Sequence, residues 1–438
     1  KEGKNNKLRA SDIKRIADTF IKRENIPKFS RVVSREEIRS NDYNLNIPRY
    51  VDSSEAAEHW DVYASMFGGI PTAEIDEMSE FWTAFPALKK ALFTESGIPY
   101  VNVSTPDIKS AIKSHPDVVG FEKAFNAAFS TFPAFLKEEL IDRMGSIEIS
   151  KAETVLSADI FERLKEIPLI DKYAAFQLLD DDWTGISIDL EMLQTEGFAA
   201  TKKVDPNLVI KKKDGKDQEV QEGWVGHIIP FDLVQATLLS AETDELHGLE
   251  SRLAEIPSEY ESILDEMTEE DKESCNDVLT EEGDAFVPKE VSKKIKELKK
   301  DRSPESVALR TLLEKVESLV KSEKEIKAEI KAKGAALQAK TKDTIESLSD
   351  EQALDLLEKK WIAPLIESIH KLPDTVIDSL VSKIQALQNK YATTFFEVEQ
   401  QISETEATLS GMIDDLEGNE YDMLGLNELK KLLGGSAE

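Results

Sequence analysis

Apolar and polar positions near the N-terminus recur with the period of an amphipathic helix. In LRASDIKRIADTFIKRENI, one helical face collects Ile13, Ile16, Ala17, Phe20 and Ile21. The opposite face is basic, and Ser11 stands at the N-cap position. The next residues predict a short apolar strand over FSRVV, a helical turn capped by Ser34 and an extended exit at Pro48. The purpose of that exit, NDYNLNIPRYVD, is not evident from the pattern.

Short helices that carry aromatic residues are expected from Glu55 to about Ala175, as in SEFWTAFPALKKALF, and such stripes are typical of a core. A β signal follows in NLVIKKKDGKDQEVQEGWVGHIIP. Its Asp-Gly turn between β-branched runs predicts a hairpin or a three-stranded meander near 207–230. The lysines around this turn are either simply solvated or in contact with phosphate: Lys202, Lys203, Lys211, Lys212, Lys213 and Lys216.

Two long helices are predicted towards the C-terminus. After Pro304 a seven-residue apolar repeat indicates a coiled-coil-like helix to about Lys342, and a second pattern runs from Pro373 to Leu416. Between them, Ser349 is a good N-cap and Trp361 would cover a bundle end. Because each apolar stripe is narrow, the two helices should pack on each other or on a partner. The candidate partner-interface residues are Leu309, Val316, Ile330, Trp361, Ile384, Tyr391 and Val398.

Charge is distributed unevenly along the 438 residues. The whole chain carries a net charge of -31, whereas residues 1–50 hold 13 basic and seven acidic residues, a local charge of +6. An acidic surface repels nucleic acid and anionic membranes, so the basic end is the expected site for a polyanion. The candidates for contact with a DNA backbone are Lys14, Arg15, Lys22, Arg23 and Arg31. The alternative is that these charges only keep the surface soluble.

The location and the catalytic chemistry of the chain are constrained mainly by what the sequence lacks. A single cysteine, Cys275, and the absence of a long apolar run favour a cytoplasmic protein without a membrane segment. The chain opens on Lys, so the true N-terminus is expected elsewhere. The five histidines are scattered, and no phosphate-binding glycine loop occurs. Asp180, Asp181 and Asp182 either hold a hard cation or, as we expect, form a solvated helix end. No metal site is predicted.

Three blocks of sequence resemble one protein family. The stretch LRASDIKRIADTF followed by FSRVVSREEIRSNDYNLNIPRYVD closely resembles the segment that closes the catalytic region of the modification subunit of type I restriction-modification enzymes. IPLIDKYAAFQLLDDDW with EGWVGHIIPFDLV resembles the middle extension of long members, and LLEKKWIAPLIESIHKLPDTVIDSLVSKIQALQNKYATTFFEVEQQI resembles their C-terminal helices. The NDYNLNIPRYVD stretch would then be the exit from the methyltransferase fold.

The resemblance implies a DNA adenine methyltransferase that uses S-adenosylmethionine. Members bind this cofactor through a Phe-x-Gly-x-Gly loop and hold a flipped adenine at an Asn-Pro-Pro-aromatic loop. Neither loop occurs in this chain, where Phe67-Gly68-Gly69 has the wrong spacing. The chain is therefore expected to be the C-terminal part of such a subunit, without catalytic or cofactor-binding residues of its own, and not to methylate DNA alone.

The expected fold is mainly α with a small β hairpin or meander. Residues 1–52 would close an α/β methyltransferase domain, 53–300 would form a helical extension, and 301–438 a long-helix hairpin for subunit assembly. The implied partners are DNA and the specificity and restriction subunits of the same system, and the implied role is assembly and clamping on DNA. The alternative is a standalone acidic helical scaffold or a regulator that mimics DNA charge.

Overall fold

The computed structural model describes residues 6–54, 59–97, 99–213, 216–280, 282–301 and 303–433. These residues form two compact units, and each is built from segments that are distant in sequence. Unit 1 comprises Lys1–Glu138, Glu148–Gly185 and Pro364–Glu438, and unit 2 comprises Glu139–Ile147 and Ile186–Ala363. The chain passes between the units four times, one of them within helix α11 (Lys172–Glu196). None of the helices within the described ranges combines the length and apolar character needed to cross a bilayer.

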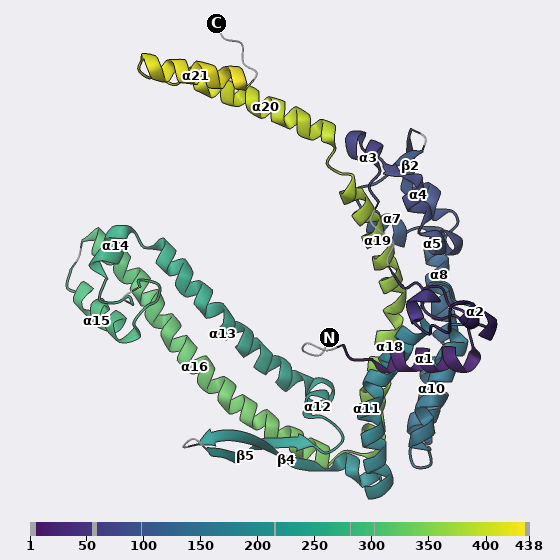
Figure 1. Ribbon diagram of the computed structural model, residues 1–438. Coiled ribbons are helices and arrows are strands. Elements are labelled where there is room, and N and C mark those ends of the chain that lie inside the picture. The colour runs from purple at the N-terminus through teal and green to yellow at the C-terminus, as the bar shows by residue number, and fades with distance from the viewer. Residues whose placement is uncertain are drawn as a thin grey trace. The chain divides into compact units, whose positions relative to one another are not determined.

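Unit 1 is mainly helical, as the sequence predicts (Figure 1). Its helices are α1 (Ala10–Lys22), α2 (Arg35–Ser40), η1 (Ile47–Arg49), α3 (Val62–Phe67), α4 (Thr72–Asp76), α5 (Ser79–Ala84), α6 (Leu88–Leu92), α7 (Ile108–Lys113), α8 (Pro116–Phe129), α9 (Phe132–Leu136), α10 (Ile149–Arg163), α18 (Ala363–His370), α19 (Leu372–Lys390), α20 (Phe395–Asp414) and α21 (Glu420–Leu432). A π-type turn, η2 (Lys137–Asp142), follows α9.

A small antiparallel sheet in unit 1 was not expected from the sequence. Its order is β1 (Ile70–Pro71), β3 (Tyr100–Val103) and β2 (Phe93–Gly97). The strands are two to five residues long, so alternation of apolar and polar residues has no room to become a signal. Val101 and Val103 pack one face of β3 against the core of the unit.

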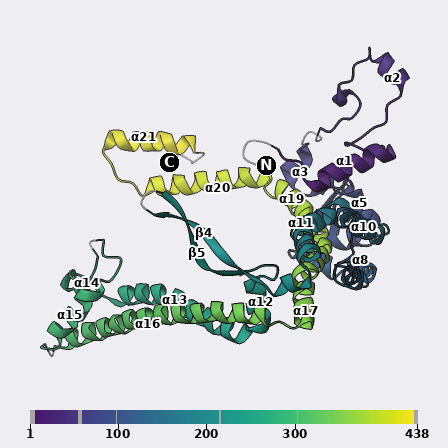
Figure 2. The same cartoon turned by 90° about the horizontal axis from the view of Figure 1, so that it is seen from below.

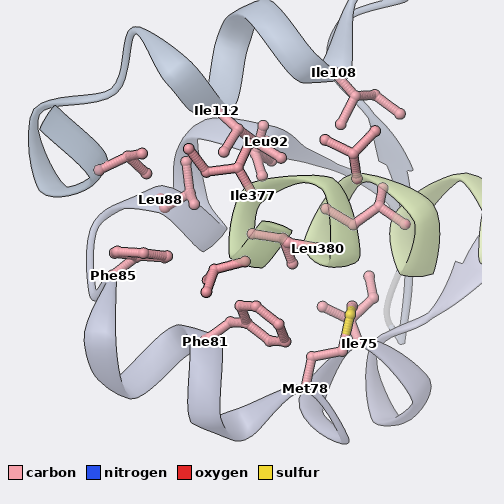
Figure 3. Close-up of a cluster of buried hydrophobic side chains, with 14 of the residues drawn as sticks. Ile75, Met78, Phe81, Phe85, Leu88, Leu92, Ile108, Ile112, Ile377 and Leu380 are labelled. Carbon is pink, nitrogen blue, oxygen red and sulfur yellow. The ribbon is translucent and has the colours of Figure 1, made fainter. Parts of the chain in front are cut away.

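The core of unit 1 joins its N-terminal aromatic helices to α19, which lies almost three hundred residues further along the chain. Phe81, Phe85 and Leu88 surround Ile377 and Leu380 of α19 in one apolar cluster (Figure 3). These side chains are almost completely buried. Phe81, Phe85 and Phe121 are thus core residues, as predicted, and α19 is an internal helix of this unit. The prediction is wrong for the first aromatic stripe, because Trp60, Tyr63 and Phe67 are more than half exposed.

Unit 2 contains the longest helix and a β ribbon. Its elements are η3 (Phe198–Lys202), β4 (Val204–Lys213), β5 (Lys216–Gly226), α12 (Phe231–Leu238), α13 (Ser240–Glu266), α14 (Glu269–Ser274), α15 (Pro288–Leu298), α16 (Pro304–Glu346) and α17 (Asp350–Trp361). The predicted hairpin near 207–230 is present as the antiparallel pair of β4 and β5. The Asp-Gly turn that was expected to join the strands lies outside the described residues.

The predicted hairpin of two C-terminal helices differs from the observed pairing. Helix α16 has the predicted extent but packs against α13, and Figures 1 and 2 both show these two helices side by side. Glu242 pairs with Lys340, and Glu266 pairs with Lys315 at 3.2 Å, so the two helices run antiparallel. Helix α13 is strongly acidic and contains Pro257. For this reason it was not predicted from the sequence as the partner of α16.

The second predicted long helix is interrupted. Helix α19 ends at Lys390 and α20 begins at Phe395, because Thr394 caps α20 by accepting a hydrogen bond from the Glu397 N–H. Ser34 and Ser349 are N-caps, as predicted. Ser11 is not a cap, because α1 already begins at Ala10 and the Ser11 N–H donates to Gln177 of α11.

Gly226, at the end of β5, occupies a position where a side chain cannot be accommodated. A Cβ atom built there would lie 1.7 Å from the carbonyl oxygen of Ile229. We expect Gly226→Ala to lower the free energy of unfolding of unit 2 by about 1–3 kcal/mol, since backbone must move. Gly248→Ala, in the open middle of α13, should instead raise it by up to about 1 kcal/mol. Urea unfolding of both variants checks this contrast, and equal effects would contradict it.

His227, directly after β5, links the start of β4 to α11. Its Nδ1 lies 2.6 Å from Asp205 and its Nε2 lies 3.1 Å from Glu196. The hydrogen bond to Asp205, reinforced by Glu196, raises the pKa of His227 above its ordinary value despite the opposing effect of burial. The protonated imidazole therefore stabilises the folded state below the unfolded pKa of about 6.5, and this contribution is lost as pH rises through the higher folded pKa.

We expect the stability of unit 2 to fall as pH rises from the ordinary histidine pKa through the raised one. The His227→Gln variant should be less stable than the native chain at pH 6, and the difference should shrink towards pH 9. Urea midpoints at a series of pH values measure this difference. A difference that is constant over the whole series would show that His227 has the same pKa in both states.

Candidate nucleic-acid and partner interface

Helix α1 lies on unit 1 with the opposite orientation from the usual amphipathic helix. Its polar side packs inward, where Ser11 and Thr19 are buried, and its apolar face points outward. Phe20 is 81% exposed and Ile21 is 75% exposed. An apolar stripe on a surface helix normally faces a core. The apolar stripe of α1 is therefore exposed surface instead of core among the described residues.

Two of the predicted DNA-contacting residues are used within the unit. The Lys14 ammonium lies 5.3 Å from the ring centre of Phe161 and 3.5 Å from Asp18. The Arg15 guanidinium lies 4.7 Å from the ring centre of Phe29 and 3.7 Å from Asp171. Cation–π and carboxylate contacts compensate both charges where they pack against the helices beneath. Lys14 and Arg15 thus hold α1 in place in this structure.

Asp18 is also bonded to α11. The Tyr173 hydroxyl donates to the Asp18 carboxylate at 3.3 Å, and burial, together with this negative charge, raises the pKa of Tyr173 to about 12. The phenol therefore remains a donor at any physiological pH. This bond, together with the contacts of Lys14 and Arg15, fixes the orientation of α1.

The other three predicted DNA-contacting residues are exposed. Lys22 and Arg23 lie at the C-terminal end of α1, where Arg23 adopts a left-handed conformation with φ of 52°. Arg31 donates to Glu37 at 2.9 Å, which compensates part of its charge. Lys22 and Arg23 remain accessible for a phosphate, and their role in DNA contact stays a prediction.

A groove runs between α1 and the loop that follows it, with a volume of about 680 Å³. Ile16, Phe20, Phe29 and Val32 give it an apolar lining, and charged residues stand at its margin. The hydroxyl of Thr19, which also lines the groove, is buried without a hydrogen-bond partner among the described residues. We call these residues the α1 groove. Ile16 and Phe20 were predicted as part of the apolar face of α1. Phe29 and Val32 were not predicted as groove residues, because their segment was expected to be a strand. That expectation is wrong, since the segment is a turn closed by a bridge between Ile26 and Ser30.

The NDYNLNIPRYVD stretch forms an irregular turn. Asp42 and Tyr43 both adopt left-handed conformations, with φ of 54° and 57°, after α2 ends. Pro48 lies inside the short 3-10 helix η1, and the expected extended exit is therefore wrong at this point, because proline also fits the first turn of a helix. Tyr43, Leu45 and Ile47 are largely exposed. The stretch thus adds apolar side chains to those exposed on α1.

Most of the predicted partner-interface residues are already covered by this chain. Leu309 and Val316 belong to a core cluster of unit 2, and Ile384 to the core of unit 1. Trp361 and Tyr391 are also buried, Ile330 is half-buried, and Val398 of α20 is exposed. Of these residues, Val398 alone presents an exposed apolar side chain in the described structure.

A larger cleft of about 1110 Å³ in unit 2 lies between the ribbon and helices α12 and α16. Its ionisable lining is Glu222, Asp232, Lys342 and Asp343, and the Lys342 ammonium lies 4.1 Å from the ring centre of Trp224. This lining contains neither a nucleophile with a base nor a basic surface. The cleft is therefore a weaker candidate for a functional site than the α1 groove.

The acidic triplet of α11 does not converge on one point. The Gln177 amide donates to Asp180 and Asp181, and burial raises the pKa values of Asp180 and Asp182. Within the described parts of the chain, His, Cys, Asp and Glu form no group of three that could hold a metal ion. The triplet lies in the middle of a helix instead of at its end, contrary to the prediction.

The N-terminal segment that contains α1 is similar to known DNA methylases. Residues 1–59 match the family model of the N-6 DNA Methylase. Over 57 residues the chain is 47% identical to the methylase subunit of the type I restriction enzyme MjaVII from Methanocaldococcus jannaschii. This match covers 13% of the present chain and 10% of the methylase subunit. No solved structure matches the chain. The matches support the predicted relationship of this segment to DNA methylases that act at N6.

Proposed function

We propose that this chain is the C-terminal region of the modification subunit of a type I restriction-modification system. The observation that carries the proposal is the methylase match of residues 1–59. The whole subunit would transfer a methyl group from S-adenosylmethionine to adenine in DNA. The loops that bind the cofactor and the adenine in that family would lie in sequence that precedes this chain.

The exposed apolar surface of α1 supports this arrangement. The segment that matches the methylases carries the exposed residues Leu8, Ile13, Ile16, Phe20, Ile21, Phe29, Val32, Tyr43, Leu45 and Ile47. Ile16, Phe20 and Phe29 come together in the α1 groove, and an exposed apolar groove of this kind is typical of an interaction site. In the proposed subunit, the α1 groove receives side chains of the methyltransferase domain and fixes that domain on unit 1.

The remainder of the chain would serve assembly with the specificity subunit and clamping on DNA. The acidic charge outside residues 1–50 makes most of this surface unsuitable for DNA, so the contacts with phosphate would come from Lys22 and Arg23. Such contacts position a complex on DNA without reading the sequence. The recognised sequence would then be read by the specificity subunit, with the restriction subunit as a further partner.

Co-purification tests the proposed assembly. The chain, carrying an affinity tag, is produced together with the specificity subunit encoded beside it, and the complex is analysed by size exclusion at micromolar concentration. We expect the two polypeptides to elute together, and Lys22→Glu with Arg23→Glu to leave this complex intact while weakening its retention of DNA. Separate elution of the two native polypeptides would overturn the proposed role in assembly.

A further inference from the structure

Helix α20 presents an apolar stripe to solvent. Phe395, Ile402 and Leu409 are spaced by seven residues, Val398 and Met412 fall on the same side with Thr405 between them, and Leu416 continues the spacing just after the helix ends. All six are exposed, with Ile402 at 53% and Met412 at 61%. A seven-residue repeat of this kind is the seam of a two-stranded coiled coil. Helix α3 also contacts α20, but the six side chains of the seam remain exposed among the described residues.

The neighbouring helix α21 leaves the seam free. It packs beside α20, where Ser410 and Ile413 are buried, and Lys430 bonds Asp414 at 2.7 Å. Ser410 and Ile413 lie at the edge of the seam or beside it, so α21 covers a different side of α20. The pair of helices is therefore complete as a hairpin and still exposes one apolar face.

The charge around the seam selects the kind of partner. Residues 395–433 contain ten acidic and two basic residues, a net charge of -8. With Phe395 at the first position of the repeat, Glu399 and Glu406 of α20 occupy positions that flank the seam, and Asp415 follows at the C-cap. In coiled coils these positions pair with charges of the facing helix. A second copy of α20 would place like charges opposite one another in at least part of the pairing, and DNA would be repelled.

We propose that the α20 seam binds a basic amphipathic helix of another polypeptide. The partner helix would carry Leu, Ile or Val at its own seam and Lys or Arg at the flanking positions. Its apolar side chains would pack between Val398, Ile402 and Leu409, and its cations would face Glu399 and Glu406. This binding surface follows from α20 itself and does not depend on the proposed membership of a methylase.

Two synthetic helical peptides test the proposal. Both have Ile and Leu at the seam, one has Lys at all flanking positions and the other has Glu, and each is titrated with the full chain by fluorescence anisotropy. We expect the Lys peptide to bind at least tenfold more tightly. The double variant Ile402→Glu with Leu409→Glu should weaken its binding at least tenfold. Ala407→Glu, which adds a charge on the opposite, exposed side of α20, should change it less than twofold.

Several results of these peptide titrations would overturn the proposal. Equal binding of the two peptides, unchanged binding by the double variant, or no binding of the Lys peptide would each overturn the proposal. Dimerisation of the chain that the double variant abolishes would also overturn it, by showing that a second copy is the occupant. Circular dichroism of the variants confirms that each measurement is made on folded protein.

Discussion

Asp189→Ala should lower the free energy of unfolding of unit 2 by about 3 kcal/mol, the lower end expected for breaking a buried ion pair. Asp189 is buried on α11 and accepts hydrogen bonds from the Lys360 ammonium at 2.5 Å and the Trp361 indole N–H at 2.7 Å. Lys360 also donates to the Ile228 carbonyl at 2.6 Å. Removing the carboxylate leaves a cation and an indole donor without their partner. Because the Lys360 side chain is 26% exposed, water can solvate its ammonium group and reduce the loss of stability.

The effect should be local and should exceed that of a surface pair. Hydrogen exchange of peptides from α11 and α17 measures it, and protection should fall in both. Asp350→Ala is the matched control, because Asp350 pairs with Lys202 on the surface, where such a pair contributes about 0–1 kcal/mol. If the two variants exchanged alike, Asp189 would not be the polar centre that holds α11, α17 and the segment before α12 together.

Ile16→Asp with Phe20→Asp should abolish most methylation by the complete subunit while leaving this chain folded. Both side chains are exposed here, so the substitutions cost unit 1 little. In the proposed subunit they would be buried against the methyltransferase domain, where each contributes about 1.5–3 kcal/mol. Loss of both, with two carboxylates at the same surface, should reduce methylation of cognate DNA at least tenfold. Methyl transfer by the complex with the specificity subunit is the measurement.

Val155→Asp provides the matched control for the α1 groove. Val155 is an exposed apolar residue of α10, outside the groove, and its substitution should leave methylation within twofold. Thermal unfolding of the isolated chain should be the same for the control and the double variant. Full methylation by the double variant would contradict the groove as a docking surface, whereas equal loss in both variants would indicate a general sensitivity of the subunit.

The sequence predicted the elements better than their contacts. The extent of α16, the β ribbon, the caps at Ser34 and Ser349 and the aromatic core all follow from local patterns. The partner of α16 could not be predicted, because apolar spacing shows that a face is buried but not which helix covers it. Cys275 makes the same point, since it stands in a polar, acidic stretch and yet is completely buried in the core of unit 2.

The candidate interface was recognised in part. The methylase-like segment and the apolar face of α1 were visible in the sequence, but amphipathicity alone suggested that the apolar face is internal and the basic face external. The structure reverses this order, because Phe161, Phe29 and Tyr173 provide rings for Lys14 and Arg15. Cation–π contacts between residues so far apart in sequence have no periodic signal. The exposed seam of α20 could be seen in its spacing, and only the structure shows it to be uncovered.

Membership of a methylase subunit is tested most directly by reading the coding sequence upstream of Lys1 and measuring the intact mass of the protein from its native cells. We expect an open frame that continues into a Phe-x-Gly-x-Gly loop and an Asn-Pro-Pro-aromatic loop, with a native polypeptide heavier than the 49.1 kDa of this chain. A native mass equal to this chain, without those loops upstream, would contradict the claim that it is the C-terminal region of a DNA methylase subunit.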